Sequence, residues 1–183
     1  MPEETDEALL DLAGRSEAAF MLLFERYREV IFRVAYRLTN SAAAAEDIAQ
    51  ECFLGLLNAP GYFDPAKGSL RTYLYGAVRN HARRYHGLRD GDVDLDDTEI
   101  DETAEVSQGL LQQEQSQVIR QAISTLPLQQ REALILFQYE ELPLEDIAAI
   151  LGIEIGAVKS RLHRARARLR RILTPYFEGS HAR

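Results

Sequence analysis

The chain has 183 residues, 46% of them hydrophobic, and a formal net charge of −8 at pH 7. This hydrophobic content is ordinary for a globular protein and excludes wholesale disorder, and the length allows one domain or two small ones. No apolar run is long enough to span a bilayer, and the acidic N-terminus lacks the basic region of a signal peptide. We therefore expect a cytoplasmic protein without a membrane span.

The first predicted helix covers residues 17–38, after an N-terminal segment formed by residues 1–15. Apolar residues recur along it at steps of three and four, which is the spacing of one helical face. These residues are Phe20, Phe24, Tyr27, Ile31, Val34 and Leu38. Asn40 and Ser41 then end the helix.

A second helix is predicted over residues 42–57. Ile48, Cys52 and Leu56 face inward, so the single cysteine is expected to be a buried, unreactive thiol. The outer face carries polar side chains that are usually only solvated. They are Glu46, Asp47, Gln50 and Glu51.

Residues 58–69 contain two prolines and two glycines and are predicted to form a loop, and residues 70–85 a third helix. Tyr73, Asn80 and Arg84 share one face of this helix, with further basic side chains nearby. Aromatic rings stack on unpaired bases while guanidinium groups hold phosphates, so this face suits single-stranded DNA. An amphipathic helix with a solvated basic edge has the same composition, and the residues alone leave both interpretations open.

An acidic segment separates two helical regions. Residues 90–105 hold nine acids and no Lys or Arg, and the rest of the chain has a net charge of +1 without them. Such self-repelling charge is typical of a flexible linker, which we place at residues 90–114. It is either a solubilising tether or a mimic of nucleic-acid charge that occupies a basic channel or shields a basic surface.

The most informative segment is a basic helix near the C-terminus. Residues 159–171 contain seven Lys or Arg and no acid, on an apolar stripe that runs from Val158 to Ile172. The face opposite the stripe carries only small residues, among them Gly156, Ser160 and Ala167. A short helix over residues 144–151 precedes it and ends at Gly152, where a left-handed C-cap favours glycine.

This order of helix, glycine turn and cationic helix predicts a helix-turn-helix whose second helix enters the major groove. A solvated basic face on an ordinary helical hairpin is the alternative. Four helices are expected in residues 115–177, beginning near Gln115, Pro127, Pro143 and Ile155. Residues 178–183 form a short tail.

Three segments together resemble the bacterial sigma factors of RNA polymerase. Residues 45–53 (AEDIAQECF) resemble the signature of sigma region 2, and residues 70–75 (LRTYLY), followed by Asn80, look like the melting and minus-ten segment. Residues 126–132 and 147–166 look like region 4. Two domains without a central third one point to the extracytoplasmic-function (group IV) class.

The resemblance implies an all-α fold of two small helical domains joined by the flexible acidic linker. A region 2-like helical bundle would occupy residues 16–89, and a region 4-like helix-turn-helix domain residues 115–177. The protein would be a dissociable subunit that binds core RNA polymerase and directs promoter-specific initiation by recognising minus-thirty-five and minus-ten elements and aiding DNA melting. Its linker would thread the basic cleft of the polymerase.

The resemblance also assigns residues. The face that docks on the clamp helices of the largest polymerase subunit would be Glu46, Asp47, Gln50, Glu51 and Leu54. The minus-ten surface would be Asn58, Tyr62, Phe63, Asp64, Arg71, Tyr73, Arg79, Asn80, Arg83 and Arg84. In the second domain, Lys159, Ser160, His163 and Arg164 would read the minus-thirty-five element, with Arg161 and Arg168 on phosphates. The flap of the second-largest subunit and an anti-sigma factor are further implied partners.

One departure from the family concerns Tyr73, because sigma factors usually carry tryptophan there and this chain has none. Tyrosine offers a smaller ring for stacking, so strand separation is expected to be weaker or more promoter-dependent. The competing hypotheses are a free-standing helix-turn-helix transcriptional regulator and a helical interaction protein. We expect no enzyme, cofactor or metal site, because the sequence has no nucleophile–base pair, metal-spaced cluster or phosphate-binding glycine loop.

Overall fold

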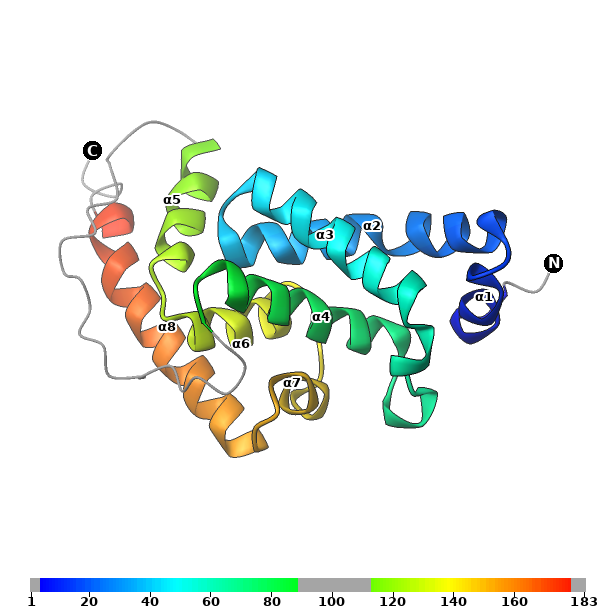
Figure 1. The fold of residues 1–183 in the computed structure, drawn as a ribbon. Helices are drawn as coiled ribbons and strands as arrows, with labels where there is room; N and C mark the ends of the chain where they lie inside the picture. The colour runs from blue at the N-terminus through cyan, green and yellow to red at the C-terminus, as the bar shows by residue number, and fades with distance from the viewer. Residues whose placement is uncertain (1–3, 89–112, 179–183) are drawn as a thin grey trace. The chain divides into compact units, whose positions relative to one another are not determined.

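The computed structural model describes residues 4–88 and 113–178, and all regular elements within them are helices (Figure 1). The chain divides into two compact units, Met1–Asp90 and Gly91–Arg183. The predicted all-α class is therefore confirmed. The acidic residues 90–105 and the end of the tail lie outside the described residues, so the predictions made for them stay predictions.

The first unit contains α1 (Asp6–Ala13), α2 (Glu17–Thr39), α3 (Ala42–Asn58) and α4 (Leu70–Tyr85). Two short 3-10 turns, η1 (Pro60–Tyr62) and η2 (Pro65–Lys67), lie between α3 and α4. The long α2 packs against each of the other three helices, and α3 also packs on α4. Buried side chains from all four helices form the core, among them Leu9, Leu23, Ile31, Ile48, Leu70 and Val78.

Serine residues fix where three of these helices begin. Ser16, Ser41 and Ser69 lie at the N-caps of α2, α3 and α4, and each hydroxyl accepts a hydrogen bond from the backbone N–H three residues later. Such a cap satisfies one of the amide groups that a first turn leaves without a partner. Asn40 ends α2 in the left-handed conformation (φ 54°), so α3 follows after a tight turn.

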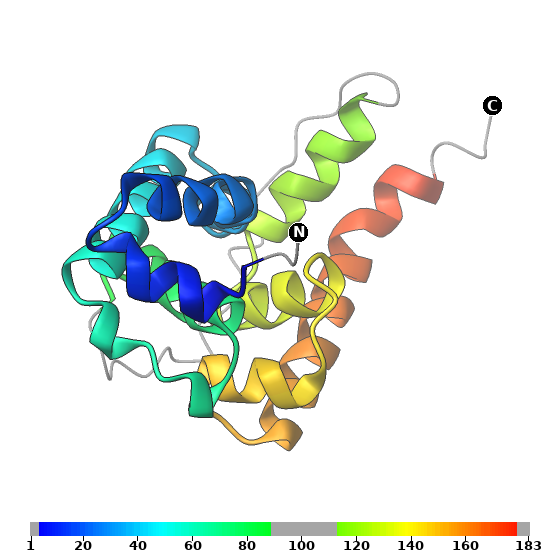
Figure 2. The same ribbon diagram turned by 90° about the vertical axis from the view of Figure 1, so that its right-hand side faces the viewer.

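The short helix α1 is joined to α2 by polar contacts as well as by its apolar side. The carboxylate of Asp6 accepts a hydrogen bond from the hydroxyl of Tyr27 and pairs with Arg26. Leu9 is completely buried. Figure 2 shows α1 packed across the N-terminal part of α2. The helix is therefore an integral part of the first unit.

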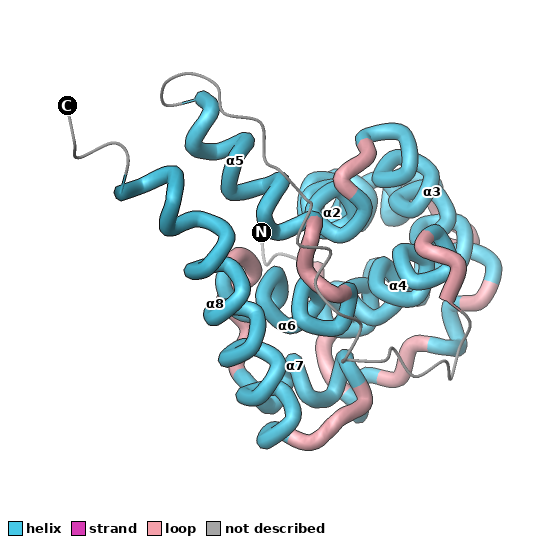
Figure 3. The backbone as a smooth tube through the Cα atoms, turned by 90° about the vertical axis from the view of Figure 1, so that its left-hand side faces the viewer, coloured by secondary structure: helices cyan, strands magenta, loops and turns pink. Residues whose placement is uncertain are grey.

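The second unit contains α5 (Gln113–Ser124), α6 (Leu128–Gln138), α7 (Leu144–Leu151) and α8 (Ile155–Glu178). The other three helices pack along α8, as Figure 3 shows. Ile123, Leu126, Leu134 and Ala165 form its core, with Ile119 and Leu169 against them. Each unit therefore has its own hydrophobic core. None of the helices in the described ranges combines the length and apolar character that crossing a membrane requires.

Candidate nucleic-acid surfaces and docking groove

The turn between α7 and α8 has the geometry that the sequence predicts. Gly152 adopts φ 65°, and the N–H of Ile153 donates to the carbonyl of Ala148 at 3.1 Å. The left-handed backbone conformation costs glycine little energy, because glycine has no Cβ. Ile147 and Leu151 hold α7 against α8 from the inside. The two helices thus form a helix-turn-helix with α8 in the second position.

The predicted apolar stripe of α8 faces the core, and the small residues face outward. Val158, Leu162 and Ala165 are at most 3% exposed, whereas Gly156 and Ala167 are exposed. The hydroxyl of Ser160 donates back to the Gly156 carbonyl at 3.1 Å, which keeps its side chain close to the helix. The outer face of α8 therefore carries only short side chains and is flanked by cations. Such a face can approach base edges closely in a major groove.

The cations of α8 differ in their surroundings. Lys159, His163 and Arg164 are exposed, but Arg161 and Arg168 are half-buried. The guanidinium of Arg166 lies 5.2 Å from the ring centroid of Phe137 on α6, a cation–π contact between the two helices. Sequence periodicity did not single out this pair, since the partner belongs to another helix.

The loop before α4 places two neighbouring aromatic residues differently. Tyr62 is 80% exposed, whereas Phe63 is 8% exposed and packs on Tyr73 with ring centroids 5.7 Å apart. Tyr73 is half-buried, and this burial raises the pKa of its hydroxyl. Asp64 accepts a hydrogen bond from the Ala66 N–H at 3.0 Å, which shapes the loop. The loop therefore presents Tyr62 and uses Phe63 to support Tyr73.

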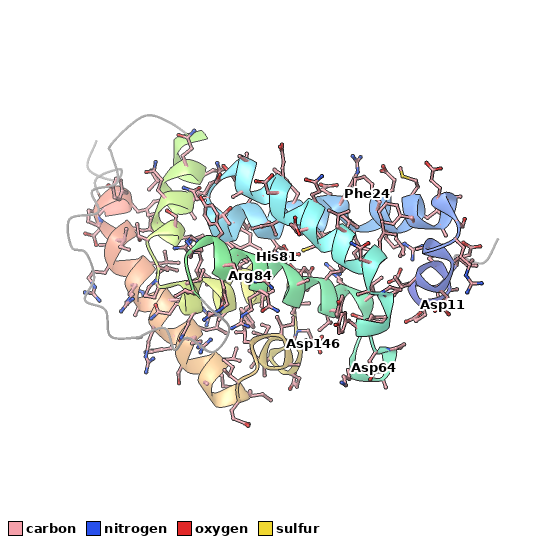
Figure 4. All side chains as sticks on the ribbon, viewed as in Figure 1. Asp11, Phe24, Asp64, His81, Arg84 and Asp146 are labelled. Carbon is pink, nitrogen blue, oxygen red and sulfur yellow. The ribbon has the colours of Figure 1, made fainter. Side chains whose placement is uncertain are left out.

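The predicted minus-ten residues on α4 and at the end of α3 differ in their exposure to solvent. Asn80 and Arg84 are exposed, as are Asn58 and Arg71, while Arg79 is half-buried and Arg83 is buried. Figure 4 shows Arg84 beside His81 toward the C-terminal end of α4, with Asp64 on the loop beyond its other end. The surface thus extends from an exposed ring at the loop to cations along the helix.

The pKa of the His81 imidazole is lowered, first by burial and then by the positive charge of Arg84, while Glu51 acts in the opposite direction. This favours the neutral ring at neutral pH. We therefore count Arg84, and not His81, as the cation at this end of α4.

A groove of about 790 Å³ runs between α2 and α3 on the first unit. Its aromatic floor is built by Phe20, Phe24 and Phe53, and the ring centroids of Phe24 and Phe53 are 4.8 Å apart. The lining residues are Phe20, Phe24, Arg28, Glu29 and Phe32 from α2, and Glu46, Ala49, Gln50, Phe53, Leu54 and Leu57 from α3.

The groove includes only part of the predicted docking face. Glu46, Gln50 and Leu54 line it, whereas Asp47 and Glu51 are exposed outside it. Phe20 and Phe24 belong to the predicted apolar face of α2, but they are half-buried and line the groove. Leu23, Tyr27 and Ile31, on the same side of α2, are buried in the core. Leu54, the apolar residue of the predicted docking face, is 43% exposed to solvent.

Cys52 is buried, as the sequence predicts. Among the residues that the structure describes, no three His, Cys, Asp or Glu side chains are grouped so that they could hold a metal ion.

Comparison with known proteins identifies both units. Residues 23–90 match the model for Sigma-70 region 2, and residues 116–169 match Sigma-70, region 4. The RNA polymerase sigma-H factor of Pseudomonas aeruginosa is 31% identical and is aligned over 96% of this chain and 97% of its own length. The ECF RNA polymerase sigma factor SigW of Bacillus subtilis is 32% identical over 85% of this chain and 89% of its own. The chain belongs to the extracytoplasmic-function RNA polymerase sigma factors.

A solved structure supports the same conclusion. The sigma factor RpoE of Bartonella quintana, in complex with the anti-sigma factor NepR, superposes with a TM-score of 0.61 at 28% identity. The match covers 85% of this chain and 96% of that one. The protein is thus a sigma subunit that directs transcription initiation. In this sigma factor, the residues predicted for the minus-ten surface and all groove residues except Phe20 lie in the region 2 match. The turn of the helix-turn-helix lies in the region 4 match, and α1 precedes both matches.

Proposed function

We propose that this sigma factor docks on core RNA polymerase through the groove between α2 and α3, with the clamp helices of the largest subunit as the partner. The observation that supports this is an apolar groove edged by acidic side chains. Buried aromatic anchors with a charged rim are typical of protein interfaces. Asp47 and Glu51 extend that rim, and the second unit would contact the flap of the second-largest subunit.

We propose further that the two DNA surfaces act only when the polymerase holds them on one promoter. The exposed residues of the loop and α4 would capture the unpaired minus-ten strand, with Tyr62 and the half-buried Tyr73 stacking on bases and Arg71 and Arg84 near phosphates. Arg83 is buried, so it is not among the proposed contacts, and Arg79 is half-buried. The α8 face would read the minus-thirty-five element. The protein would act in the cytoplasm, and an anti-sigma factor that covers these surfaces would regulate it, as NepR is bound to RpoE.

Docking is tested by placing a charge in the groove. Leu54→Glu should weaken binding to core polymerase at least about tenfold, since it buries an acid in the groove that the partner would cover. Leu12→Glu is the matched control, because Leu12 is a similarly exposed leucine (49%) on α1, outside the groove. Fluorescence anisotropy of labelled protein with core polymerase gives both affinities, and thermal melts check the fold. Equal binding by both variants would contradict the docking site.

The promoter function is tested with and without polymerase. The free protein should bind duplex promoters poorly, because two small modules joined by a strongly acidic segment have little net attraction for phosphates. The holoenzyme should give run-off transcripts from promoter fragments. Tight, sequence-specific binding of duplex DNA by the free protein, with no transcripts from the holoenzyme, would instead favour a free-standing regulator.

A further inference from the structure

Arg71 lies in the first turn of α4, directly after the loop that presents Tyr62. Its side chain is exposed, yet its Nε donates a hydrogen bond of 2.9 Å to the hydroxyl of Tyr75, one turn further along. The guanidinium carbon lies 5.6 Å from the centroid of the Tyr75 ring. Tyr75 is only 1% exposed, so a ring fixed in the core holds an arginine at the surface.

A second set of contacts places charge beside this arginine. The hydroxyl of Tyr27 on α2 donates to Asp6 on α1, and Arg26 also pairs with Asp6. The pKa of Tyr27 is raised, first by burial and then by its hydrogen bond to Asp6. The positive charges of Arg26 and Arg71 act in the opposite direction. The positive charge of Arg71 on α4 therefore acts on the Tyr27 hydroxyl of α2, and α2 packs against both α1 and α4.

Two arginines and one carboxylate give this cluster a formal charge of +1. The two guanidinium groups therefore outnumber the one carboxylate that an incoming anion would meet. Arginine binds phosphate well when its planar guanidinium is already oriented, because less rotamer freedom is then lost on binding. A bond from Nε to a buried hydroxyl restricts the side chain of this exposed arginine in that way.

We propose that Tyr75 is a positioning residue for promoter opening: its hydroxyl holds the guanidinium of Arg71 ready to bind a phosphate of the unpaired minus-ten strand. Tyr75 is buried and does not touch DNA itself. The inference rests on the proposed minus-ten function of this surface. It adds a residue that the family resemblance did not assign and that periodicity places simply in the core.

The test uses holoenzyme reconstituted from the full-length chain and a forked promoter DNA whose minus-ten strand is unpaired. Tyr75→Phe keeps the buried ring and removes only the acceptor. It should weaken binding to the fork about three- to tenfold, the range expected for one hydrogen bond. If a phosphate contact is lost, the salt dependence of log K should become shallower by about 0.7.

A double-mutant cycle separates positioning from a general structural effect. Arg71→Ala should weaken fork binding at least as much as Tyr75→Phe, and Tyr75→Phe should then add nothing in the Arg71→Ala background. Arg71→Lys, at an exposed position, keeps the charge and should likewise become insensitive to Tyr75→Phe. Tyr36→Phe, a half-buried tyrosine more than two turns beyond Tyr27 on α2, is the control for loss of a hydroxyl and should bind normally.

Two results would overturn the proposal but leave the proposed minus-ten surface standing. In the first, Arg71→Ala weakens fork binding and Tyr75→Phe does not. In the second, Tyr75→Phe weakens fork binding by the same factor with and without Arg71. If Arg71→Ala leaves fork binding unchanged, the proposed role of Arg71 in minus-ten binding fails, and this inference fails with it. Thermal melts of each variant show whether a loss follows unfolding.

Discussion

The rings of Phe63 and Tyr73 meet edge-on, with 5.7 Å between their centroids and 67° between their planes. This contact ties the loop after α3 to the first turns of α4. Edge-to-face pairs of this kind add to the free energy of apolar burial. Tyr73 occupies the position where the family usually has tryptophan, so the loop supports the smaller ring from one side.

Replacing Phe63 should therefore affect stability and promoter opening together. Phe63→Ala removes a buried ring, and we expect it to lower the free energy of unfolding of the first unit by about 3 kcal/mol and to reduce permanganate reactivity of the minus-ten thymines. Tyr62→Ala is the control, because an 80% exposed ring contributes little to folding. It should reduce opening with the melting temperature unchanged. A larger loss of stability in Tyr62→Ala would contradict the assignment.

The thiol of Cys52 should be unreactive in the folded protein. Burial, followed by the nearby charge of Glu51, raises its pKa to about 12 from an ordinary value of 9.0. At pH 8 we expect disulfide-exchange reagents to label it far more slowly in buffer than in denaturant. Comparable labelling rates in the two conditions would show that the α3 face opens readily.

The same shift makes stability depend on pH. Above pH 9 the unfolded thiol loses its proton while the folded one keeps it, so the unfolded state gains stability and the fold loses it between pH 9 and about pH 12. Cys52→Ala removes this contribution. Denaturant titrations of both proteins at pH 8 and pH 10.5 should show a smaller fall for the variant.

Glu141, between α6 and α7, has a backbone φ of 52°. This left-handed conformation is unfavourable for glutamate and tolerated by asparagine. Glu141→Asn should therefore stabilise the second unit by roughly 0.5 kcal/mol, seen as a higher melting temperature. The converse change, Asn40→Ala at the left-handed end of α2, should destabilise the first unit by about 1 kcal/mol. A lower melting temperature for Glu141→Asn, or a higher one for Asn40→Ala, would rule out the backbone explanation.

Arg164 is exposed on the side of α8 that the proposed minus-thirty-five contact requires. If it pairs with a guanine, Arg164→Ala should cost ~1–3 kcal/mol and relax specificity at one upstream base pair. Transcription from a set of single-base promoter variants measures this. Arg15→Ala, an exposed arginine just before α2, controls for the loss of one positive charge. An equal loss on every promoter variant would make Arg164 a phosphate contact.

Local sequence signals predicted the long helices closely. The expected ranges 17–38, 42–57 and 70–85 compare with Glu17–Thr39, Ala42–Asn58 and Leu70–Tyr85, because serine caps and the apolar period act within a few residues. The sequence left open whether the segment that forms α1 is ordered. This helix has only eight residues and is held by the Asp6–Tyr27 bond, a contact between residues far apart in the sequence.

The sequence predicted which helix faces carry the candidate surfaces, but not how the single side chains on each face are packed. Periodicity placed Phe20 and Phe24 on one apolar face of α2 with Tyr27 and Ile31, but only packing shows that these two rings line a groove while Tyr27 and Ile31 fill the core. In the same way, Arg164 and Arg166 are both exposed on α8, and the run of cations gave no sign that Arg166 contacts Phe137 on α6. Both distinctions depend on contacts between helices, which a one-dimensional pattern does not contain.

The separate hydrophobic cores of the two units have an evolutionary consequence. The helices α5, α6 and α7 pack along α8, and the core of the first unit is built from other helices. Under the proposed division of promoter contacts, upstream preference can therefore drift while the core of the strand-opening unit is unchanged. Paralogues built on this plan can thus diversify their regulons one promoter half at a time.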